Sequence, residues 1–397
     1  MDPIRNPFAP GAGTRPPELA GRDEIIRETD IALQRTVTGK NARSGIFLGL
    51  RGTGKTVLLT NFESLAEDRN HLTAFIEAPE NNPLSDLLYP KIYQILRRLS
   101  LIESAKSQSH KAFQALRGFA AAFNIKVGDV SISVDPEPGY ADSGDLEMDL
   151  PDLFVRVGDA AKAAGKGVTF LVDELQYLSK TELSAIIVAL HRVNQKTLPV
   201  LFLGAGLPQI AGLTGNAKSY AERLFSFTQI GPLSKADAAE AIRAPIESQD
   251  EKITEAALDA IYLKTDGYPY FLQEWGYQAW NSVETSPIRE TDVIDASQAA
   301  RARLDDGFFR VRFDRLTPKE REYVVAMAAL GDGPYRSSEI AEKLQEKPST
   351  LGPRRAKIIH KGMIYSPNYG DIDFTVPMFA DFLRRLDTAP TSSILGE

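Results

Sequence analysis

A glycine-rich segment near residue 50 has the residue types and spacing of a phosphate-binding loop. The run GLRGTGKT, from Gly49 to Thr56, fits the pattern G-x-x-x-x-G-K-[S/T]. It lies between an apolar run and a helical pattern, which is the context that the motif requires and which argues against a chance match. Its glycines let backbone N–H groups close around phosphate oxygens, and the N-terminus of the following helix adds partial positive charge.

Each part of this loop has an expected role. Lys55 is expected to reach the β- and γ-phosphates of a nucleotide, and the hydroxyl of Thr56 is expected to bind Mg²⁺. Arg51 either touches phosphate or faces solvent, and the sequence favours neither. We assign the nucleotide contacts in this segment to Gly49, Arg51, Gly52, Thr53, Gly54, Lys55, Thr56 and Val57.

A second acidic motif ends a β-branched run further along the chain. VTFLVDEL places Asp173 and Glu174 at the carboxyl end of a predicted buried strand, where α/β sheets bind their ligands. Asp173 is then a direct or indirect ligand of Mg²⁺, and Glu174 is the candidate base that polarises an attacking water. The alternative is an acidic pair that merely ends a strand ahead of the capping box from Ser179 to Glu182.

The elements that must position these motifs alternate between strands and helices. Short apolar runs at 44–50, 72–78, 168–174 and 199–206 are separated by segments long enough for crossover helices, and 225–231 supplies a fifth strand. This pattern predicts an α/β fold with a mainly parallel sheet covered on both faces. Residues 107–150 break the alternation, and we interpret them as an insertion with a hairpin that turns at Gly128 and Asp129.

Composition sets limits on the whole chain. At about 150 residues per domain, 397 residues give two to three domains. The absence of cysteine excludes disulfides, thiolate metal sites and a cysteine nucleophile, and four histidines without a shared short spacing give no zinc motif. No run approaches the roughly 18 apolar residues of a membrane span, and proline and glycine stand where a signal peptide would be apolar. We therefore expect a cytoplasmic protein without a membrane segment.

The C-terminal part changes character twice. We expect an extended arm over 1–20, the sheet domain over 21–233, a helical subdomain over 234–315 and a flexible tail over 389–397. Residues 316–388 follow the order helix, helix, helix, hairpin, which is that of a winged helix-turn-helix domain.

The third helix of this domain carries the basic residues. From Lys347 to Gly370 there are five lysines and arginines and no acidic residue, although the whole chain has a net charge of −7. Because the third helix of such a domain enters the major groove, we expect DNA contacts there. The alternative is a winged helix that packs on the rest of the chain or on a partner protein. The expected DNA contacts are Arg354, Arg355, Lys357 and Lys361.

With these motifs in order along most of its length, the sequence resembles AAA+ ATPases of the origin-recognition-like and STAND-related group. ELAGRDEI resembles the box that packs near adenine in that group, which implies adenine contacts from Leu19, Gly21 and Arg22. GYP resembles the Gly-x-Pro element of the helical lid, so Pro269 is expected to shape the base pocket; a proline that only begins a helix is the alternative. YAERLF lies where relatives carry an arginine, which makes Arg223 the candidate finger or sensor; a solvated or salt-bridged side chain is the alternative.

The sequence departs from that group at the end of the fourth strand, in the helical lid and, mildly, in the adenine box, where Asp23 stands in place of the usual glutamate. Relatives usually have a polar sensor at the end of the fourth strand, whereas LFLGAGLP offers only glycine and alanine there. The helical lid shows no evident arginine sensor, which favours the STAND-like branch and slow turnover.

The resemblance implies a P-loop NTPase sheet with an AAA+ core, a helical lid and a C-terminal winged helix, with ATP and Mg²⁺ as cofactors. We hypothesise an ATPase that couples its nucleotide state to DNA binding. The alternative is a signalling or scaffold ATPase that turns over slowly and whose winged helix contacts protein. A P-loop kinase is disfavoured because no acceptor-site motif is visible. Assembly with copies of itself or with partner proteins stays open.

Overall fold

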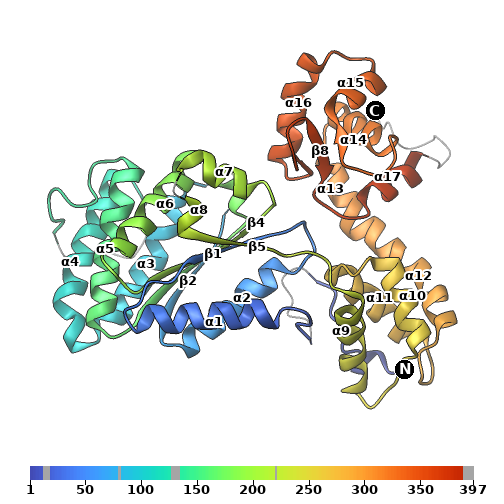
Figure 1. The fold of residues 1–397 in the computed structure, drawn as a ribbon, viewed down its shortest axis with the longest axis horizontal. Helices are drawn as coiled ribbons and strands as arrows, with labels where there is room; N and C mark the ends of the chain where they lie inside the picture. Colours follow the sequence, from blue (N-terminus) through green and yellow to red (C-terminus); the bar gives the residue numbers. More distant parts are fainter. Residues whose placement is uncertain (12–17, 79–81, 127–134, 220, 388–397) are drawn as a thin grey trace. The chain divides into compact units, whose positions relative to one another are not determined.

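The computed structural model describes residues 1–11, 18–78, 82–126, 135–219 and 221–387. It divides into two compact units (Figure 1). The sheet unit consists of Arg22–Gly49 and Lys55–Ile230, and the helical unit consists of Met1–Gly21, Leu50–Gly54 and Gly231–Glu397. Among the described residues, no helix combines the length and the apolar character needed to cross a membrane.

The sheet unit contains a five-stranded sheet in which every pair is parallel. Its order is β2-β3-β4-β1-β5, and it confirms the predicted α/β class and the five predicted strands. Strands β1, β3 and β4 are buried along their whole length, which explains why their sequences are almost continuously apolar. The strands are β1 (Ser44–Leu48), β2 (His71–Glu77), β3 (Gly167–Asp173), β4 (Val200–Gly206) and β5 (Phe225–Gln229).

Helices cover both faces of this sheet (Figure 1). One face is covered by α1 (Asp23–Val37) and α2 (Lys55–Asp68). The other face packs against α3 (Leu84–Ser100), α5 (Leu146–Ala163) and α6 (Lys180–Gln195). The shorter helical elements of the unit are η2 (Glu103–Ala105), η3 (Leu175–Tyr177), α7 (Ile210–Ala217) and α8 (Ala221–Leu224).

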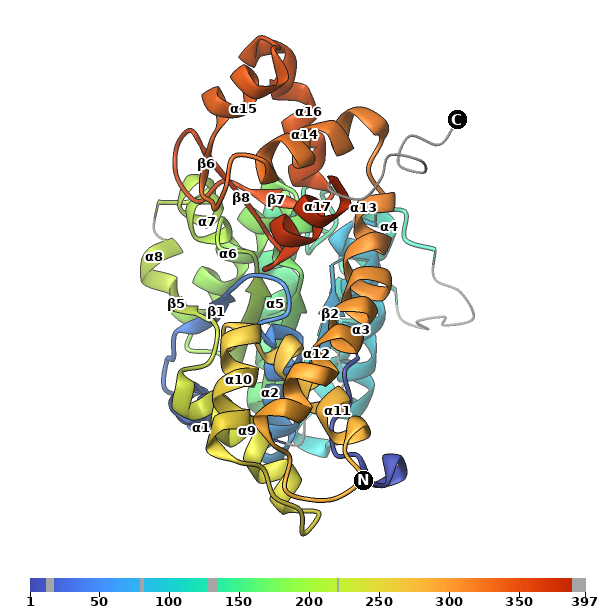
Figure 2. The same ribbon diagram turned by 90° about the vertical axis from the view of Figure 1, so that its right-hand side faces the viewer.

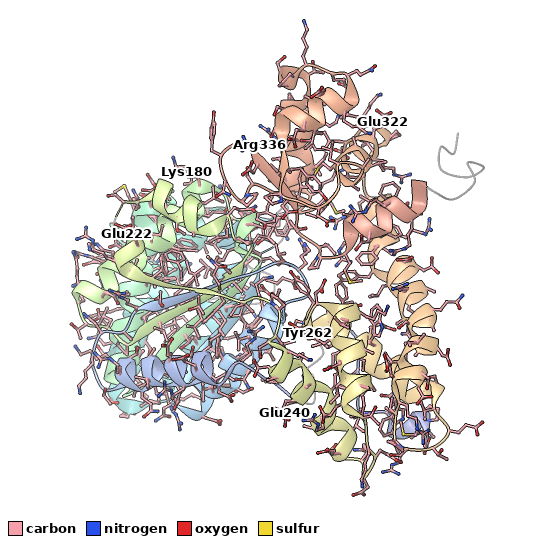
Figure 3. The ribbon with its side chains drawn as sticks, turned by 45° about the vertical axis from the view of Figure 1, so that its right-hand side comes forward. Lys180, Glu222, Glu240, Tyr262, Glu322 and Arg336 are labelled. Carbon is pink, nitrogen blue, oxygen red and sulfur yellow. The ribbon has the colours of Figure 1, made fainter. Side chains whose placement is uncertain are left out.

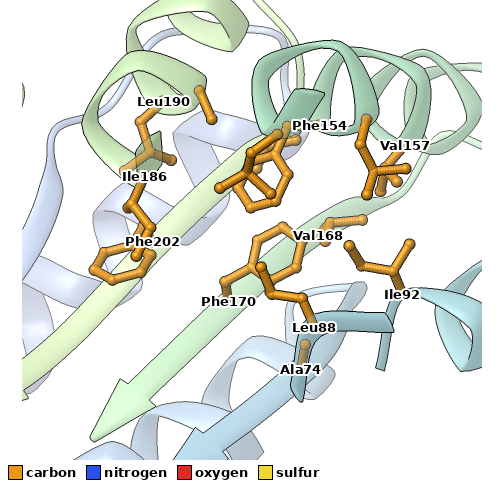
Figure 4. Close-up of a cluster of buried hydrophobic side chains, with 14 of the residues drawn as sticks. Ala74, Leu88, Ile92, Phe154, Val157, Val168, Phe170, Ile186, Leu190 and Phe202 are labelled. Carbon is orange, nitrogen blue, oxygen red and sulfur yellow. The ribbon is translucent and has the colours of Figure 1, made fainter. Parts of the chain in front are cut away.

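Aromatic side chains fill the core between β3, β4 and the helices above them (Figure 4). The rings of Phe154 on α5 and Phe170 on β3 stack with centroids 4.4 Å apart and planes 6° apart. Phe202 on β4 joins the same core together with Ile186 and Leu190 of α6. Burial of these large side chains fixes the strand whose carboxyl end carries Asp173.

The segment predicted as an insertion begins with a core helix. Helix α4 (Lys106–Ala122) packs on α3 and α5, and Ala112, Ala115 and Phe119 are inaccessible to solvent. These residues recur at helical spacing, a signal that the sequence interpretation did not use. The predicted turn at Gly128 and Asp129 lies outside the described residues.

The helical unit contains two groups of elements. Its first group is η1 (Pro3–Arg5), α9 (Lys235–Glu247), α10 (Glu255–Thr265), α11 (Pro269–Ser282) and α12 (Glu290–Leu304). A π-helical turn, Asp305–Arg310, continues α12 into α13 (Val311–Asp314), so the helical path is unbroken (Figure 2).

The second group has the predicted winged-helix order. It runs α14 (Pro318–Ala328), β6 (Tyr335–Arg336), α15 (Ser337–Leu344), α16 (Pro348–His360), β7 (Ile364–Tyr365), β8 (Asp371–Phe374) and α17 (Phe379–Asp387). The three short strands form an antiparallel sheet in the order β6-β8-β7, and the β7–β8 hairpin is the wing.

Aromatic rings join these two groups into one core. Phe309 of the π-helical turn packs on Phe271 of α11 at 6.2 Å and on Phe382 of α17 at 5.4 Å, measured between ring centroids. Phe308 stacks on Tyr270 at 4.6 Å. Such pairs stabilise beyond their area burial. The two groups therefore share one hydrophobic core within the helical unit, and the boundary predicted at 315/316 lies between them.

The first residues of the chain, expected to form an arm, pack on α11. The backbone oxygen of Asp2 accepts a hydrogen bond of 2.9 Å from the indole of Trp280. Asn6 donates to the Tyr277 oxygen at 3.1 Å, and Phe8 is 3% exposed. Gly276 makes room for that ring, because a Cβ at this position would lie 2.8 Å from Phe8 Cε1.

Candidate nucleotide-binding and DNA-binding sites

The predicted phosphate loop has the local geometry that the motif requires. Strand β1 ends at Leu48 and α2 begins at Lys55, so the loop lies between a strand and a helix N-terminus. Gly52 and Gly54 have φ angles of 84° and 88°, a left-handed conformation that side chains with a Cβ rarely adopt. The hydroxyl of Thr53 donates to the Leu50 oxygen at 2.9 Å and closes the turn. This is a backbone suited to surrounding an anion.

The two residues predicted to bind Mg²⁺ are brought together. Thr56 Oγ1 donates a hydrogen bond of 2.5 Å to Asp173 Oδ2, although 117 residues separate them. Burial raises the pKa of Asp173, and the Thr56 hydrogen bond opposes that rise. A hydroxyl and a carboxylate are oxygen donors that suit Mg²⁺, which in nucleotide sites is commonly held by one or two such groups together with phosphates. Among the described residues, no group of three or more histidine, aspartate or glutamate side chains is arranged so that it could hold a metal ion.

Glu174 follows Asp173 in an unusual backbone conformation. Its φ and ψ of 55° and 42° are left-handed, which costs a residue with a Cβ on the order of 1 kcal/mol or more. Its backbone N–H donates to Asp173 Oδ1 at 2.8 Å, which fixes the Asp173 carboxylate against the backbone of Glu174. Strain of this kind persists where the surrounding structure enforces it, and it occurs often at functional sites.

A glutamine that the sequence analysis did not single out lies beside Glu174. The side-chain amide of Gln176 donates to Glu174 Oε2 and accepts from the Leu207 N–H at 3.1 Å. Leu207 directly follows β4, where the sequence offered no polar sensor. The signal available in the sequence was a polar side chain two residues after the acidic pair.

Arg51 contacts the winged helix, an outcome that neither sequence alternative included. Its backbone N–H donates to the Thr375 oxygen at 2.8 Å, and its Nε donates to the Gly362 oxygen at 3.3 Å. Both acceptors flank the β7–β8 hairpin, and Thr375 Oγ1 also bonds Gly362 at 2.6 Å. The next loop residue, Gly52, accepts from the Tyr270 N–H at 3.2 Å. The winged helix therefore contacts the loop at Arg51, and α11 contacts it at Gly52.

The residues expected near the base lie at turns and helix ends. Gly21 has a φ of 68° and leaves no space for a Cβ, which would lie 2.8 Å from the Asp237 carboxyl. Arg22 is the N-cap residue of α1, and Pro269 is the first residue of α11. Leu19 is half-buried. Their assignment to adenine stays a prediction.

Arg223, the candidate finger, lies in the short helix α8 immediately before β5. Its side chain is exposed at the surface of the sheet unit. This exposure fits both a finger that reaches a neighbouring copy and a solvated side chain, so its role stays a prediction.

Three of the four predicted DNA contacts make internal bonds. Arg354 pairs with both carboxylate oxygens of Glu346 at 3.0 and 3.1 Å, and Arg355 donates to Ser337 Oγ at 2.8 Å. Lys361 donates to Glu320 at 2.7 Å. Lys357 is exposed. The positive charge of this segment is therefore partly neutralised by Glu346, just before α16, and by Glu320, 41 positions from Lys361.

We expect the Lys361–Glu320 ion pair to make a measurable contribution to the free energy of unfolding. The Glu320 side chain is 4% exposed, and burial alone would raise its pKa, but hydrogen bonds from Lys361 and Thr317 bring the pKa below its ordinary value of 4.5. Such a carboxylate stabilises the fold above pH 4.5 and loses this contribution as pH falls through the lowered pKa. We expect Lys361→Met to lower the free energy of unfolding by about 1–3 kcal/mol at neutral pH.

Urea denaturation at pH 7 and pH 4 measures this effect. The difference between wild type and Lys361→Met should shrink at the lower pH, because pH 4 lies below the ordinary pKa of 4.5 and the stabilisation is lost as pH falls from there through the lowered pKa. Lys357→Met is the matched control, because Lys357 lies four residues earlier, on α16, and is exposed. Equal losses in the two variants would contradict a specific role for the pair.

Two family models match the chain. Residues 18–203 match the model described as AAA ATPase domain, and residues 306–383 match a model described as domain of unknown function (DUF8462). The fold is that of an AAA+ ATPase. The first match contains the predicted phosphate loop together with Asp173 at the end of β3 and Glu174 after it, and the second contains most of the winged helix.

Similar proteins extend over nearly the whole length of the chain. The Walker-type ATPase of Pyrococcus abyssi superposes with a TM-score of 0.59 over 94% of this chain and 97% of that chain, at 16% identity. Cdc6p from Pyrobaculum aerophilum gives a TM-score of 0.47 at 14% identity, over 97% of this chain and 98% of that chain. An uncharacterized HTH-type transcriptional regulator from Methanocaldococcus jannaschii is 23% identical over 362 residues, 89% of this chain and 85% of its own length.

Proposed function

We propose that this AAA+ protein binds and hydrolyses ATP with Mg²⁺ and couples its nucleotide state to DNA binding through the winged helix. The observation that carries the coupling is the pair of hydrogen bonds from Arg51 to Thr375 and Gly362. A phosphate-binding loop gains contacts to the nucleotide when the nucleotide binds. Coupling between the nucleotide site and the DNA site requires two states of the protein that differ in their contacts. In this proposal the hydrogen bonds from Arg51 to Thr375 and Gly362 differ between the ATP-bound and the ADP-bound protein.

In the proposed reaction, the loop residues bind and orient the triphosphate. Backbone N–H groups of Thr53 and Gly54 surround phosphate oxygens, and Lys55 contributes a positive charge to the β- and γ-phosphates. Thr56 and Asp173 hold Mg²⁺, which when bound neutralises charge that develops on the transferred phosphoryl group. Glu174 orients the attacking water and accepts its proton.

Further residues complete the proposed site. Leu19, Gly21, Arg22 and Pro269 take the adenine side, as the resemblance to origin-recognition-like ATPases implies. Arg223 acts from a neighbouring copy of the chain, where an arginine finger is worth about 10³ to 10⁵ in turnover. The exposure of Arg223 supports this assignment.

The proposed DNA surface is α16 together with the wing. Lys357 on α16 is exposed. Arg336 is exposed as well and lies on β6, the strand that pairs with β8 of the wing (Figure 3). Tyr369 projects fully into solvent at the end of the wing. The name of the M. jannaschii relative, an HTH-type regulator, adds weight to a nucleic-acid partner.

A signalling or scaffold ATPase is the second candidate. The internal bonds of Arg354 and Lys361 favour it, because these two side chains already have anionic partners. In this alternative the winged helix contacts protein and turnover is slow.

Binding of duplex DNA at several salt concentrations, with ATP or ADP present, tests the proposal. We expect log K to fall with log salt by about 0.9 for each phosphate contact, and the affinity to differ between the two nucleotides. Arg51→Ala removes the Nε bond to Gly362 and should bring the ratio of the ATP and ADP affinities close to one. Arg27→Ala, an exposed arginine on α1, is the control and should keep the ratio.

Two outcomes would favour the second candidate. A salt-independent or absent response to DNA removes the proposed partner. A wild-type DNA affinity that is identical in ATP and ADP removes the coupling, even where DNA binds.

A further inference from the structure

Two glycines at the end of β4 make room for the turn that follows the acidic pair. A Cβ at Gly204 would lie 2.6 Å from Leu175 Cδ1, closer than such atoms approach in real structures. A Cβ at Gly206 would lie 3.1 Å from Gln176 Oε1 and 3.0 Å from Ile210 Cγ1. The missing polar side chain at this strand end therefore has a physical reason: η3 packs into the space that a side chain would fill.

The orientation of the Gln176 amide is determined by its neighbours. The Leu207 N–H can only donate, so the amide oxygen must face it, as the 3.1 Å contact shows. The NH₂ group then faces the opposite way and donates to Glu174 Oε2. Gln176 thus links the end of β4 to the carboxylate of Glu174.

We propose that Gln176 is a positioning residue for ATP hydrolysis, and that it takes the place of the polar sensor absent from β4. The inference rests on the proposed function, because it assigns Gln176 a task only if Glu174 orients the attacking water. The donated hydrogen bond selects one rotamer of a side chain whose backbone is already left-handed. A general base must lie within hydrogen-bond reach of the proton that it accepts, so this restriction bears directly on the rate.

Gln176→Met tests the proposal, because methionine keeps the length of the side chain and loses both hydrogen bonds. We expect kcat to fall about 10- to 100-fold, since a displacement of about 1 Å at a reacting group can cost 10²-fold. The Kd for ATP should stay within about twofold of wild type. Gln195→Met, an exposed glutamine at the end of α6, is the control and should leave kcat and Kd unchanged.

A double-mutant cycle with Glu174→Gln separates positioning from a structural role. If Gln176 acts through Glu174, then Gln176→Met should have almost no further effect on single-turnover rates in the Glu174→Gln background. Full additivity would overturn the proposal, as would a wild-type kcat in Gln176→Met. Gln176→Glu, which keeps the acceptor for Leu207 and places a carboxylate against Glu174, should lower kcat at least as far.

The same measurements distinguish the two levels of inference. A wild-type protein that does not hydrolyse ATP overturns the proposed function and this inference with it. A wild-type protein that hydrolyses ATP, with Gln176→Met unaffected, overturns this inference alone. Parallel loss of ATP affinity and thermal stability in both Gln176 variants would mean a structural role and would also overturn it.

Discussion

Replacing Lys55 by alanine should reduce the affinity for ATP by at least about 100-fold. Hydrogen bonds to charged groups are worth about 1.5–3 kcal/mol each, and Lys55 is proposed to contact both the β- and the γ-phosphate. A loss of about 3 kcal/mol corresponds to roughly two powers of ten in Kd. Isothermal titration with ATP and Mg²⁺ measures this directly. The buried position of Lys55, 9% exposed, makes its charge more effective than that of a lysine in bulk water.

Lys180 provides a matched control for this variant. Lys180 is the first residue of α6, as Lys55 is of α2, but it follows Ser179 and not a run of left-handed glycines (Figure 3). Lys180→Ala should bind ATP as wild type does. Equal binding by Lys55→Ala, or no binding by wild type, would contradict the assignment of the loop.

Motifs made of consecutive residues were predictable from the sequence. The glycine-rich loop between a strand and a helix, the strand that ends at Asp173 and the winged-helix order of elements each depend on local patterns, and the structure has all three. The meeting of Thr56 and Asp173 was predictable as well, because parallel strands bring their carboxyl ends to one edge of a sheet.

Contacts between distant residues were not predictable in the same way. Arg51 and Gly362 are 311 positions apart, and no periodicity links them. Lys361 and Glu320 form an ion pair although they are 41 positions apart. The fold thus places an acidic side chain against one of the basic residues that suggested a DNA-binding surface. Side-chain partners depend on how elements pack, and packing is set by the whole core and not by local residue types.

The glycines of β4 show how a departure from a family pattern gains meaning in the structure. In the sequence, Gly204 and Gly206 cast doubt on the positioning of water. In the structure they leave space for Leu175 and Gln176, and a hydrogen-bonding amide stands where a strand residue was expected. The polar group is thus supplied from a neighbouring turn.

Glu174→Gln should lower kcat for ATP hydrolysis by about 10² to 10⁴-fold and leave the Kd for ATP within about threefold. The amide keeps the size of the side chain but cannot accept the proton of an attacking water, so the loss falls on turnover. Phosphate release and ATP titration on the same preparation measure the two quantities. Glu240→Gln, at an exposed glutamate of α9, should change neither (Figure 3). Unchanged turnover in Glu174→Gln would contradict the role of Glu174 as the base. The acidic pair would then only end strand β3, and the left-handed backbone at Glu174 would have no part in the reaction.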